Sequence, residues 1–194
     1  MPGTTCREAI KKWQEEKQQD PAEAEEVLLC CQIPFIERLD DSLNQLENVE
    51  KLSLSTNSID KMIALPKLRK IKILSLGRNN IKRIAGLDEI GQTLEQLWIS
   101  YNQIEKLDGM TQCIKLKTLF ASNNRVKNWD DVGKLALLPE LKIVVLVGNP
   151  IYGTGEKKEW AVTAAQVVKK IPNIEYVDNF AITKTVKQMA AELD

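Results

Sequence analysis

The sequence contains no histidine, which removes the side chain that most often acts as a general base or a metal ligand near neutral pH. Catalysis would then need another nucleophile with a base, or a cluster of metal ligands, and the chain shows neither pattern. Its glycines lack the GxxxxGK and GxGxxG spacings of phosphate-binding loops. The paired carboxylates Asp40 with Asp41 and Asp130 with Asp131 are interpreted as caps of helices or turns. We therefore expect a protein that is not an enzyme, with no catalytic residue, cofactor, metal or small-molecule substrate.

The chain also lacks an excess of charge of either sign, since 27 basic residues balance 27 acidic ones. A neutral balance disfavours sequence-independent binding to nucleic acid. There is no apolar run of about 18 residues and no secretory signal at the N-terminus, which disfavours a membrane as partner. The four cysteines lack the paired framework of secreted repeat proteins. They are interpreted as reduced thiols in a cytosolic protein.

What the chain does have is one pattern repeated five times. Each copy has two aliphatic residues two apart, an asparagine three residues after the second, and another aliphatic residue two further on. The copies are Leu52, Leu54, Asn57, Ile59; Leu74, Leu76, Asn79, Ile81; Leu97, Ile99, Asn102, Ile104; Leu119, Ala121, Asn124, Val126; and Val144, Leu146, Asn149, Ile151. The asparagines follow one another after 22, 23, 22 and 25 residues. This period and pattern are the signature of leucine-rich repeats.

The pattern predicts an α/β fold, a leucine-rich-repeat solenoid of short 22-residue coils with a parallel sheet and helical caps at both ends. Each aliphatic pair is a short strand whose alternate side chains point inward. Each asparagine satisfies backbone donors and acceptors in the turn that follows, because its amide can do both. Aliphatic residues then recur at every third position, which fits a 3₁₀-like return limb, except for a short helical stretch predicted after Trp129.

The flanks are predicted to cap the solenoid. Residues 1–32 form an N-terminal helical cap, with one helix capped by Thr4 or Thr5 and a second helix from Asp20 to Cys31. Residues 33–151 hold the repeats, with a degenerate first coil at 33–48 and five coils from residue 49. Residues 152–178 form a C-terminal cap, with a helix from Trp160 to Lys170 and a strand-like edge. Residues 179–194 are either a disordered tail or a weakly amphipathic helix.

A contact surface follows from the inward aliphatic pairs, because the residues beside them must lie on the open, concave face of the sheet. We call this the open sheet face; its outward residues are 51, 53 and 55, 73, 75 and 77, 96, 98 and 100, 118, 120 and 122, and 143, 145 and 147. The first coil is polar, whereas the later coils carry apolar residues, which are Ile73, Trp98, Phe120, Ile143, Val145 and Val147. A contiguous exposed apolar patch usually marks an interface. Trp98 and Phe120 are the predicted anchors, with Arg78, Tyr101 and Asn123 at the rim; the alternative is that a cap helix covers part of this face.

The motif strings resemble one repeat family closely. LSLSTNSIDKM (52–62), ILSLGRNNIKRI (73–84), LEQLWISYNQIEKL (94–107), ASNNRVKNW (121–129) and VGNPIY (147–152), with EAIKKWQEE, IPFIERLDDSL and IPNIEYVD in the flanks, are similar to the leucine-rich-repeat light chains of outer-arm axonemal dynein. The resemblance implies a non-catalytic subunit that binds a dynein heavy chain near the microtubule-binding tip of its stalk and modulates how the motor engages the microtubule. It implies residence in the cytoplasm and in the axoneme of cilia or flagella, and it leaves open a direct contact with tubulin.

The resemblance also implies that a C-terminal helix reaches toward the motor with an apolar, an acidic and a basic position. These fall on Phe180, Thr183 and Lys187, and Thr183 departs from the acidic character. Two other functions remain open at this point. One is a regulatory adaptor of the short-repeat type that binds protein phosphatase 1, and the other is an RNA-associated scaffold, which the neutral charge disfavours.

Overall fold

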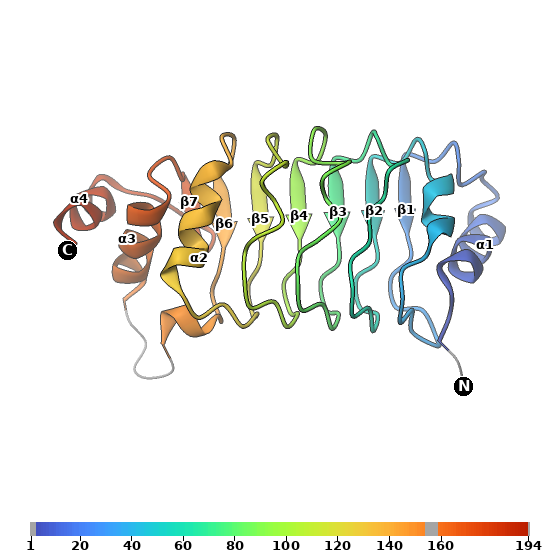
Figure 1. The fold of residues 1–194 in the computed structure, drawn as a ribbon, viewed down its shortest axis with the longest axis horizontal. Coiled ribbons are helices and arrows are strands. Elements are labelled where there is room, and N and C mark those ends of the chain that lie inside the picture. The colour runs from blue at the N-terminus through green and yellow to red at the C-terminus, as the bar shows by residue number, and fades with distance from the viewer. Residues whose placement is uncertain (1–2, 154–158, 194) are drawn as a thin grey trace.

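The computed structural model describes residues 3–153 and 159–193, which form a parallel array of strands with helices at its two ends (Figure 1). The strands are β1 (Glu26–Leu28), β2 (Lys51–Ser53), β3 (Ile73–Ser75), β4 (Gln96–Trp98), β5 (Thr118–Phe120), β6 (Ile143–Val145), β7 (Tyr176–Val177) and β8 (Phe180–Ala181). The helices are α1 (Cys6–Lys17), α2 (Trp129–Gly133), α3 (Trp160–Lys170) and α4 (Lys184–Glu192), and the short 3₁₀ segments are η1 (Asp41–Gln45), η2 (Lys134–Leu137) and η3 (Pro150–Tyr152).

The strands pair in sequence order from β1 to β8, parallel except for the antiparallel pair β7 with β8. Register is constant along the array, so that Leu52 lies beside Leu74 and Leu97 beside Leu119. These inward residues are buried in one continuous core. The predicted leucine-rich-repeat solenoid with a parallel sheet is therefore confirmed.

The five repeat asparagines form a buried ladder between the coils. Asn79 shows the pattern, since its Oδ1 accepts from the Ile59 amide at 3.0 Å and its Nδ2 donates to the carbonyls of Leu54 and Leu76, each at 3.0 Å. Each of the five amides therefore ties one coil to the coil before it. The structural role predicted for these residues is confirmed, since equivalent bonds occur at the other members, which are Asn57, Asn102, Asn124 and Asn149.

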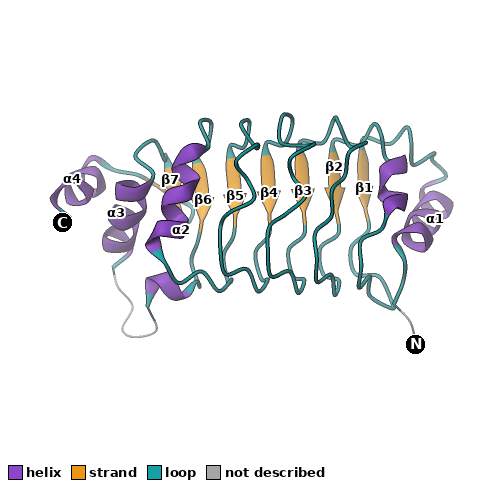
Figure 2. Ribbon diagram, viewed as in Figure 1, coloured by secondary structure: helices purple, strands orange, loops and turns teal. Residues whose placement is uncertain are grey.

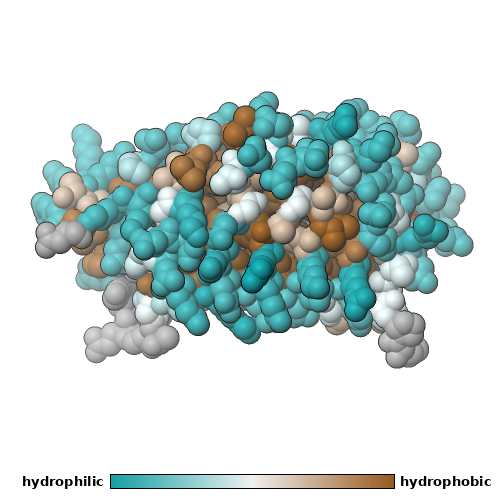
Figure 3. All heavy atoms as spheres, viewed as in Figure 1, coloured by the Kyte–Doolittle hydropathy of each residue, from teal (hydrophilic) through white to brown (hydrophobic). Residues whose placement is uncertain are grey.

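The return limbs between strands are turns and irregular segments, with a buried aliphatic residue at about every third position, as predicted (Figure 2). The helical stretch expected after Trp129 is present as α2 followed by η2. Figure 3 looks onto this return-limb side and shows hydrophobic residues along its middle between hydrophilic borders. None of the helices in the described ranges has both the length and the apolar character needed to cross a bilayer.

The N-terminal cap differs from the prediction in its second half. Thr5 caps α1 in a reciprocal capping box with Glu8, as expected. The helix predicted from Asp20 to Cys31 is wrong, because Glu26–Leu28 is the strand β1, paired with β2. Only a strand can hydrogen-bond to the free edge of β2, so tertiary pairing decides the conformation here. The first coil thus takes its strand from before residue 33, and η1 lies on its return limb.

The C-terminal cap closes the array through one acidic residue. Asp178 Oδ1 accepts from the amides of Leu146 and Val147, at 2.7 and 2.9 Å, and its Oδ2 accepts from the Tyr152 hydroxyl at 2.7 Å. This carboxylate occupies the place where a further repeat would offer its own backbone. Beyond it, α4 lies against α3 with Val186 and Ala190 buried, so residues 184–192 are a docked helix rather than a tail.

Candidate functional site

The open sheet face is formed by side chains that alternate with the buried aliphatic residues. In its middle row the strand register places Ser75 beside Trp98, Trp98 beside Phe120, and Phe120 beside Val145. Because neighbouring strands lie about 4.8 Å apart, these residues are direct neighbours along the face. The register thus divides the face into a polar half over β2 and β3 and an apolar half from β4 onward.

Trp98 and Phe120 form the centre of the apolar half. Their rings meet edge to face, with centroids 5.4 Å apart and planes at 84°, a favoured geometry for aromatic pairs. Trp98 stays 39% exposed, and its indole nitrogen donates to Gln96 Oε1 at 3.1 Å. The contact with Phe120 holds the indole while leaving much of it open to a partner.

The other predicted apolar residues differ in how much surface they offer. Val147 is 48% exposed, and Ile73 and Ile143 are half-buried. Val145 lies on the face in register but is only 5% exposed, so it supports its neighbours and offers almost no contact surface. Its predicted place in the exposed patch is therefore wrong, because flanking side chains cover a short valine between two strands.

The rim residues share an unusual backbone. Arg78, Tyr101 and Asn123 each precede a ladder asparagine and adopt left-handed conformations, with φ of 54°, 58° and 53°. The Arg78 guanidinium lies 4.4 Å from the centre of the Tyr101 ring, a cation–π arrangement. Tyr101 is 48% exposed. Arg78 and Tyr101, but not Asn123, line a shallow depression of about 410 Å³ that Trp98 and Phe120 also line.

The polar half is a chain of hydroxyl groups. Ser55 Oγ lies 2.7 Å from Ser75 Oγ and 3.3 Å from Ser53 Oγ, which in turn lies 3.0 Å from Cys30 Sγ. These groups satisfy one another, so the polar half presents a hydrogen-bonded surface with little apolar area. A partner that seeks apolar contact therefore gains most over β4 to β6.

No cap helix among the described residues covers the apolar half. In Figure 1, α1 lies beyond β1 at one end of the array, while α3 and α4 lie beyond β7 at the other. The measured exposure of Trp98, Tyr101 and Val147 agrees with this placement. The alternative in which this molecule covers its own face therefore does not hold for the described residues.

Two surface residues extend the face beyond the predicted set. Tyr176 pairs in register with Ile143 and is 42% exposed, which continues the apolar half onto β7. Leu28 takes the equivalent outward place on β1 and is 44% exposed. The rule used for the five coils would have found Tyr176, since it stands directly before the inward Val177. Leu28 was not predicted to lie on this face, because the sequence pattern had placed it in a helix instead of a strand.

The three predicted C-terminal residues do not form one cluster. Phe180 is 59% exposed and its ring lies 5.2 Å from that of Trp160. Thr183 is the N-cap of α4, accepting from the Val186 amide at 3.3 Å. Lys187 is exposed on the first turns of that helix.

The described residues hold no arrangement that suggests chemistry. Their His, Cys, Asp and Glu side chains nowhere gather in threes that could hold a metal ion. Burial raises the pKa of the Cys6 thiol to about 12 and that of Cys113 to about 11, so neither forms a thiolate near neutral pH. The geometry is that of a binding surface.

Comparisons with known proteins identify close relatives. The chain is 55% identical over 183 residues to dynein axonemal light chain 1 of Bos taurus, covering 93% of this chain and 94% of the relative. It is 46% identical over 190 residues to dynein axonemal light chain 1 of Chlamydomonas reinhardtii, covering 96% and 95%. No family model matches the sequence.

Solved structures support the fold. An internalin of Listeria monocytogenes superposes with a TM-score of 0.57 at 19% identity, covering 77% of this chain and 40% of that one. The Drosophila melanogaster SNF/U2A′ complex gives a TM-score of 0.52 at 20% identity, covering 86% and 79%. At these identities the likeness concerns architecture alone.

Proposed function

The chain belongs to the dynein axonemal light chain 1 family, and we propose that it binds a dynein heavy chain, near the microtubule-binding tip of the stalk, through the apolar half of its open sheet face. It is a non-catalytic leucine-rich-repeat protein, so its effect on the motor must come from binding. The proposed sites of action are the cytoplasm and the axoneme of cilia or flagella.

The Trp98–Phe120 pair, with Trp98 exposed and Phe120 half-buried, is the observation that carries this proposal. Tryptophan is among the residues that dominate interface energetics, at about 2 kcal/mol or more when truncated. The flanking exposed residues Tyr101, Val147 and Tyr176 broaden the apolar area around it. An amphipathic heavy-chain helix fits such a surface, because its apolar stripe can lie across neighbouring strands.

The mechanism we propose is positional. A rigid solenoid seated beside the microtubule-binding region alters which stalk orientations reach the microtubule, and it brings α4 toward the motor. Phe180, Thr183 and Lys187 are then candidates for a second, smaller contact. A direct contact with tubulin belongs to the same proposal, since a light chain at the stalk tip lies next to the microtubule surface.

The decisive test is Trp98→Ala, with binding to a recombinant stalk fragment measured by calorimetry. We expect affinity to fall by about tenfold or more, in line with about 2 kcal/mol for a truncated hot spot. The melting temperature should change little, because Trp98 is 39% exposed and lies outside the core. Leu137→Ala is the matched control, since Leu137 is 66% exposed but lies in η2 on the return-limb side.

Two results would contradict the proposal. A large loss of melting temperature in Trp98→Ala would show that the indole is a core group. Equal binding by both variants would place the heavy chain elsewhere. Affinity capture from detergent-extracted axonemes adds an independent check, because recovery of a phosphatase catalytic subunit without a dynein heavy chain would favour the phosphatase adaptor instead.

A further inference from the structure

We propose that a second surface, the edge of the solenoid that follows the asparagine ladder, binds a linear acidic peptide segment through a column of four cations. The column consists of Arg38, Lys61, Arg83 and Lys106. It lies outside the open sheet face and requires no part of the heavy-chain proposal.

The column arises from the repeat itself. Each member stands two residues after a buried aliphatic residue of the turn, as Lys61 follows Ile59 and Arg83 follows Ile81. Successive members are separated by 23, 22 and 23 residues, which is one coil each. Because every coil advances by one strand spacing, the four side chains rise in line at intervals of about 4.8 Å. All four are exposed.

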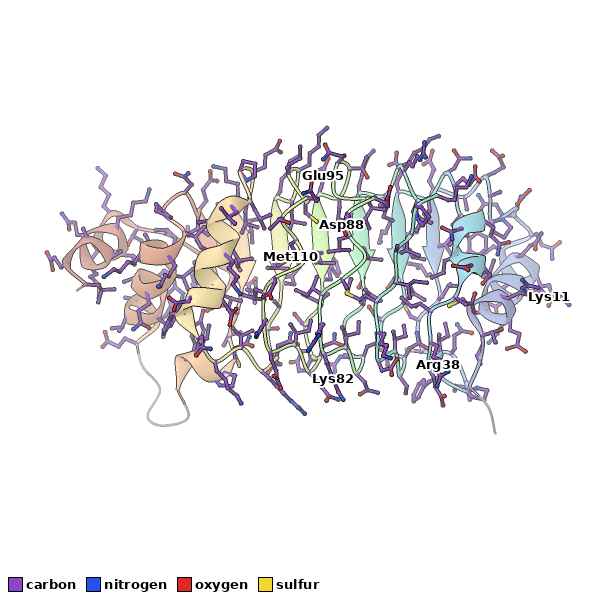
Figure 4. The ribbon with its side chains drawn as sticks, viewed as in Figure 1. Lys11, Arg38, Lys82, Asp88, Glu95 and Met110 are labelled. Carbon is purple, nitrogen blue, oxygen red and sulfur yellow. The ribbon has the colours of Figure 1, made fainter. Side chains whose placement is uncertain are left out.

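The two edges of the solenoid differ in whether their cations form ion pairs. On the edge that precedes the strands, lysines pair with carboxylates of neighbouring coils: Lys72 with Glu50 at 2.7 Å, Lys117 with Glu95 at 3.0 Å and Lys142 with Glu175 at 2.9 Å. None of the four column residues forms an ion pair with any described residue. Figure 4 shows the two edges, with Arg38 and Lys82 at one and Glu95 at the other. The column therefore has charge free for a partner.

Carboxylates also occur on this edge, directly before three of the four column residues, and they limit the classes of partner that could bind there. The position before each column residue carries Glu37, Asp60, Lys82 and Glu105. The positive charge therefore forms a narrow line, widened only where Lys82 stands beside Arg83, rather than a broad field. A nucleic-acid duplex needs a wider basic surface, whereas a single peptide strand can follow one line of cations.

The spacing and shape of the edge fit such a strand. Three coil intervals of about 4.8 Å give a column of about 14 Å, which an extended peptide covers in about five residues. Shallow depressions lie between successive coils along it. One is lined by Lys61, Lys82 and Arg83 with Asp60, and the next by Lys82, Arg83 and Lys106 with Glu105 and Asp108. A run of consecutive glutamates or aspartates can therefore place carboxylates against all four cations.

The test uses the full chain and fluorescein-labelled decaglutamate, with decaglutamine and a thymidine decanucleotide as comparison probes, followed by fluorescence anisotropy. The edge variant is Arg83→Glu with Lys106→Glu. Its matched control is Lys17→Glu with Lys115→Glu, which changes the net charge equally at exposed lysines that form no ion pair with a described residue. Because the wild-type chain carries no net charge, any attraction for decaglutamate must be local.

We expect the wild-type chain to bind decaglutamate and not decaglutamine, with the edge variant about tenfold weaker or more and the control variant unchanged. Absence of wild-type binding at low salt, equal losses in both variants, or tighter binding of the decanucleotide would each overturn the proposal. If a charge reversal disturbs folding, the same comparison is made with glutamine at the same positions. Stalk-fragment binding by the edge variant should be unchanged, so failure of one proposal leaves the other intact.

Discussion

At the residue scale, the most constrained side chains are those that satisfy backbone groups between coils. Asn102 shows this, because it is only 8% exposed and its Oδ1 accepts from the Ile81 amide at 2.9 Å. Its Nδ2 donates to the carbonyls of Leu76 and Ile99, at 3.0 and 3.1 Å. Such bonds span two coils, so the loss of one amide leaves backbone groups of both coils without partners.

We expect Asn102→Ala to lower the free energy of unfolding by about 1–3 kcal/mol, because buried donors and acceptors lose their partners. Urea denaturation followed by circular dichroism measures the change. Asn80→Ala is the control, since Asn80 belongs to the same kind of turn but is exposed, and its side chain makes two long hydrogen bonds, each of 3.4 Å, with Ser58 and Gln103. Equal loss in the two variants would argue against the ladder as a source of stability.

A second residue-scale constraint is the close approach of neighbouring coils at Gly86. This glycine has φ of +72°, and a Cβ there would lie 2.4 Å from the carbonyl carbon and oxygen of Ile63. We expect Gly86→Ala to destabilise the fold by about 1–3 kcal/mol or more. Gly133→Ala in α2 should be neutral or stabilising, because its Cβ would meet only the flexible Lys170 side chain at 3.6 Å. Thermal melts of the two variants give the comparison.

At the element scale, the caps are set by single polar contacts at their ends. The Glu8 carboxylate accepts from the Thr5 backbone amide at 2.8 Å, and the Thr5 hydroxyl accepts from the Glu8 amide at 3.2 Å. At the far end, Asp178 does the equivalent for the last coil. The first contact satisfies amides at the start of α1, and the second satisfies amides of the last coil that have no following repeat.

The N-terminal contact predicts a pH dependence. Its hydrogen bonds to Thr5 hold the pKa of Glu8 below the usual 4.5. The stabilisation is therefore present above about pH 4.5 and is lost as the pH falls through the lower pKa of the folded state. We expect Glu8→Ala to lower the melting temperature at pH 7, with the difference from wild type shrinking below pH 4.5. A difference that stays constant down to about pH 3 would show that the carboxylate is not involved.

At the scale of the whole molecule, one repeat produces two distinct surfaces. The open sheet face places Trp98 and Phe120 beside each other through strand register. The edge after the asparagine ladder aligns Lys61, Arg83 and Lys106 through the coil period. One surface is apolar and the other charged, so the partners they select differ in chemistry.

This division predicts different responses to salt. Raising sodium chloride from about 0.05 M to about 0.5 M should weaken decaglutamate binding by about tenfold or more, because exposed charges are screened. Stalk-fragment binding should change by less than about threefold, since apolar burial is insensitive to screening. Titrations of the full chain at both salt concentrations test this. Strong salt dependence of stalk binding would indicate that the stalk does not bind through the apolar half of the open sheet face.

The sequence predicted most of the fold but not all of the surface. The period of the aliphatic residues and asparagines located all five coils, because each position has one physical role. Residues 26–28 were misassigned because a short apolar run fits either a helical stripe or a strand, and pairing with β2 decides between them. Val145 was placed in the exposed patch because alternation gives a side chain's direction, whereas its neighbours determine its exposure.

By itself, then, the sequence determined the solenoid and its inward leucines, since these depend on local spacing alone, and its motif strings indicated the family. Only the tertiary structure decided that Trp98 stays exposed beside Phe120, that Asp178 closes the last coil, and that lysines of one edge form ion pairs while the four column cations form none with the described residues. Those outcomes depend on which residues of different coils become neighbours, and local spacing does not contain that information.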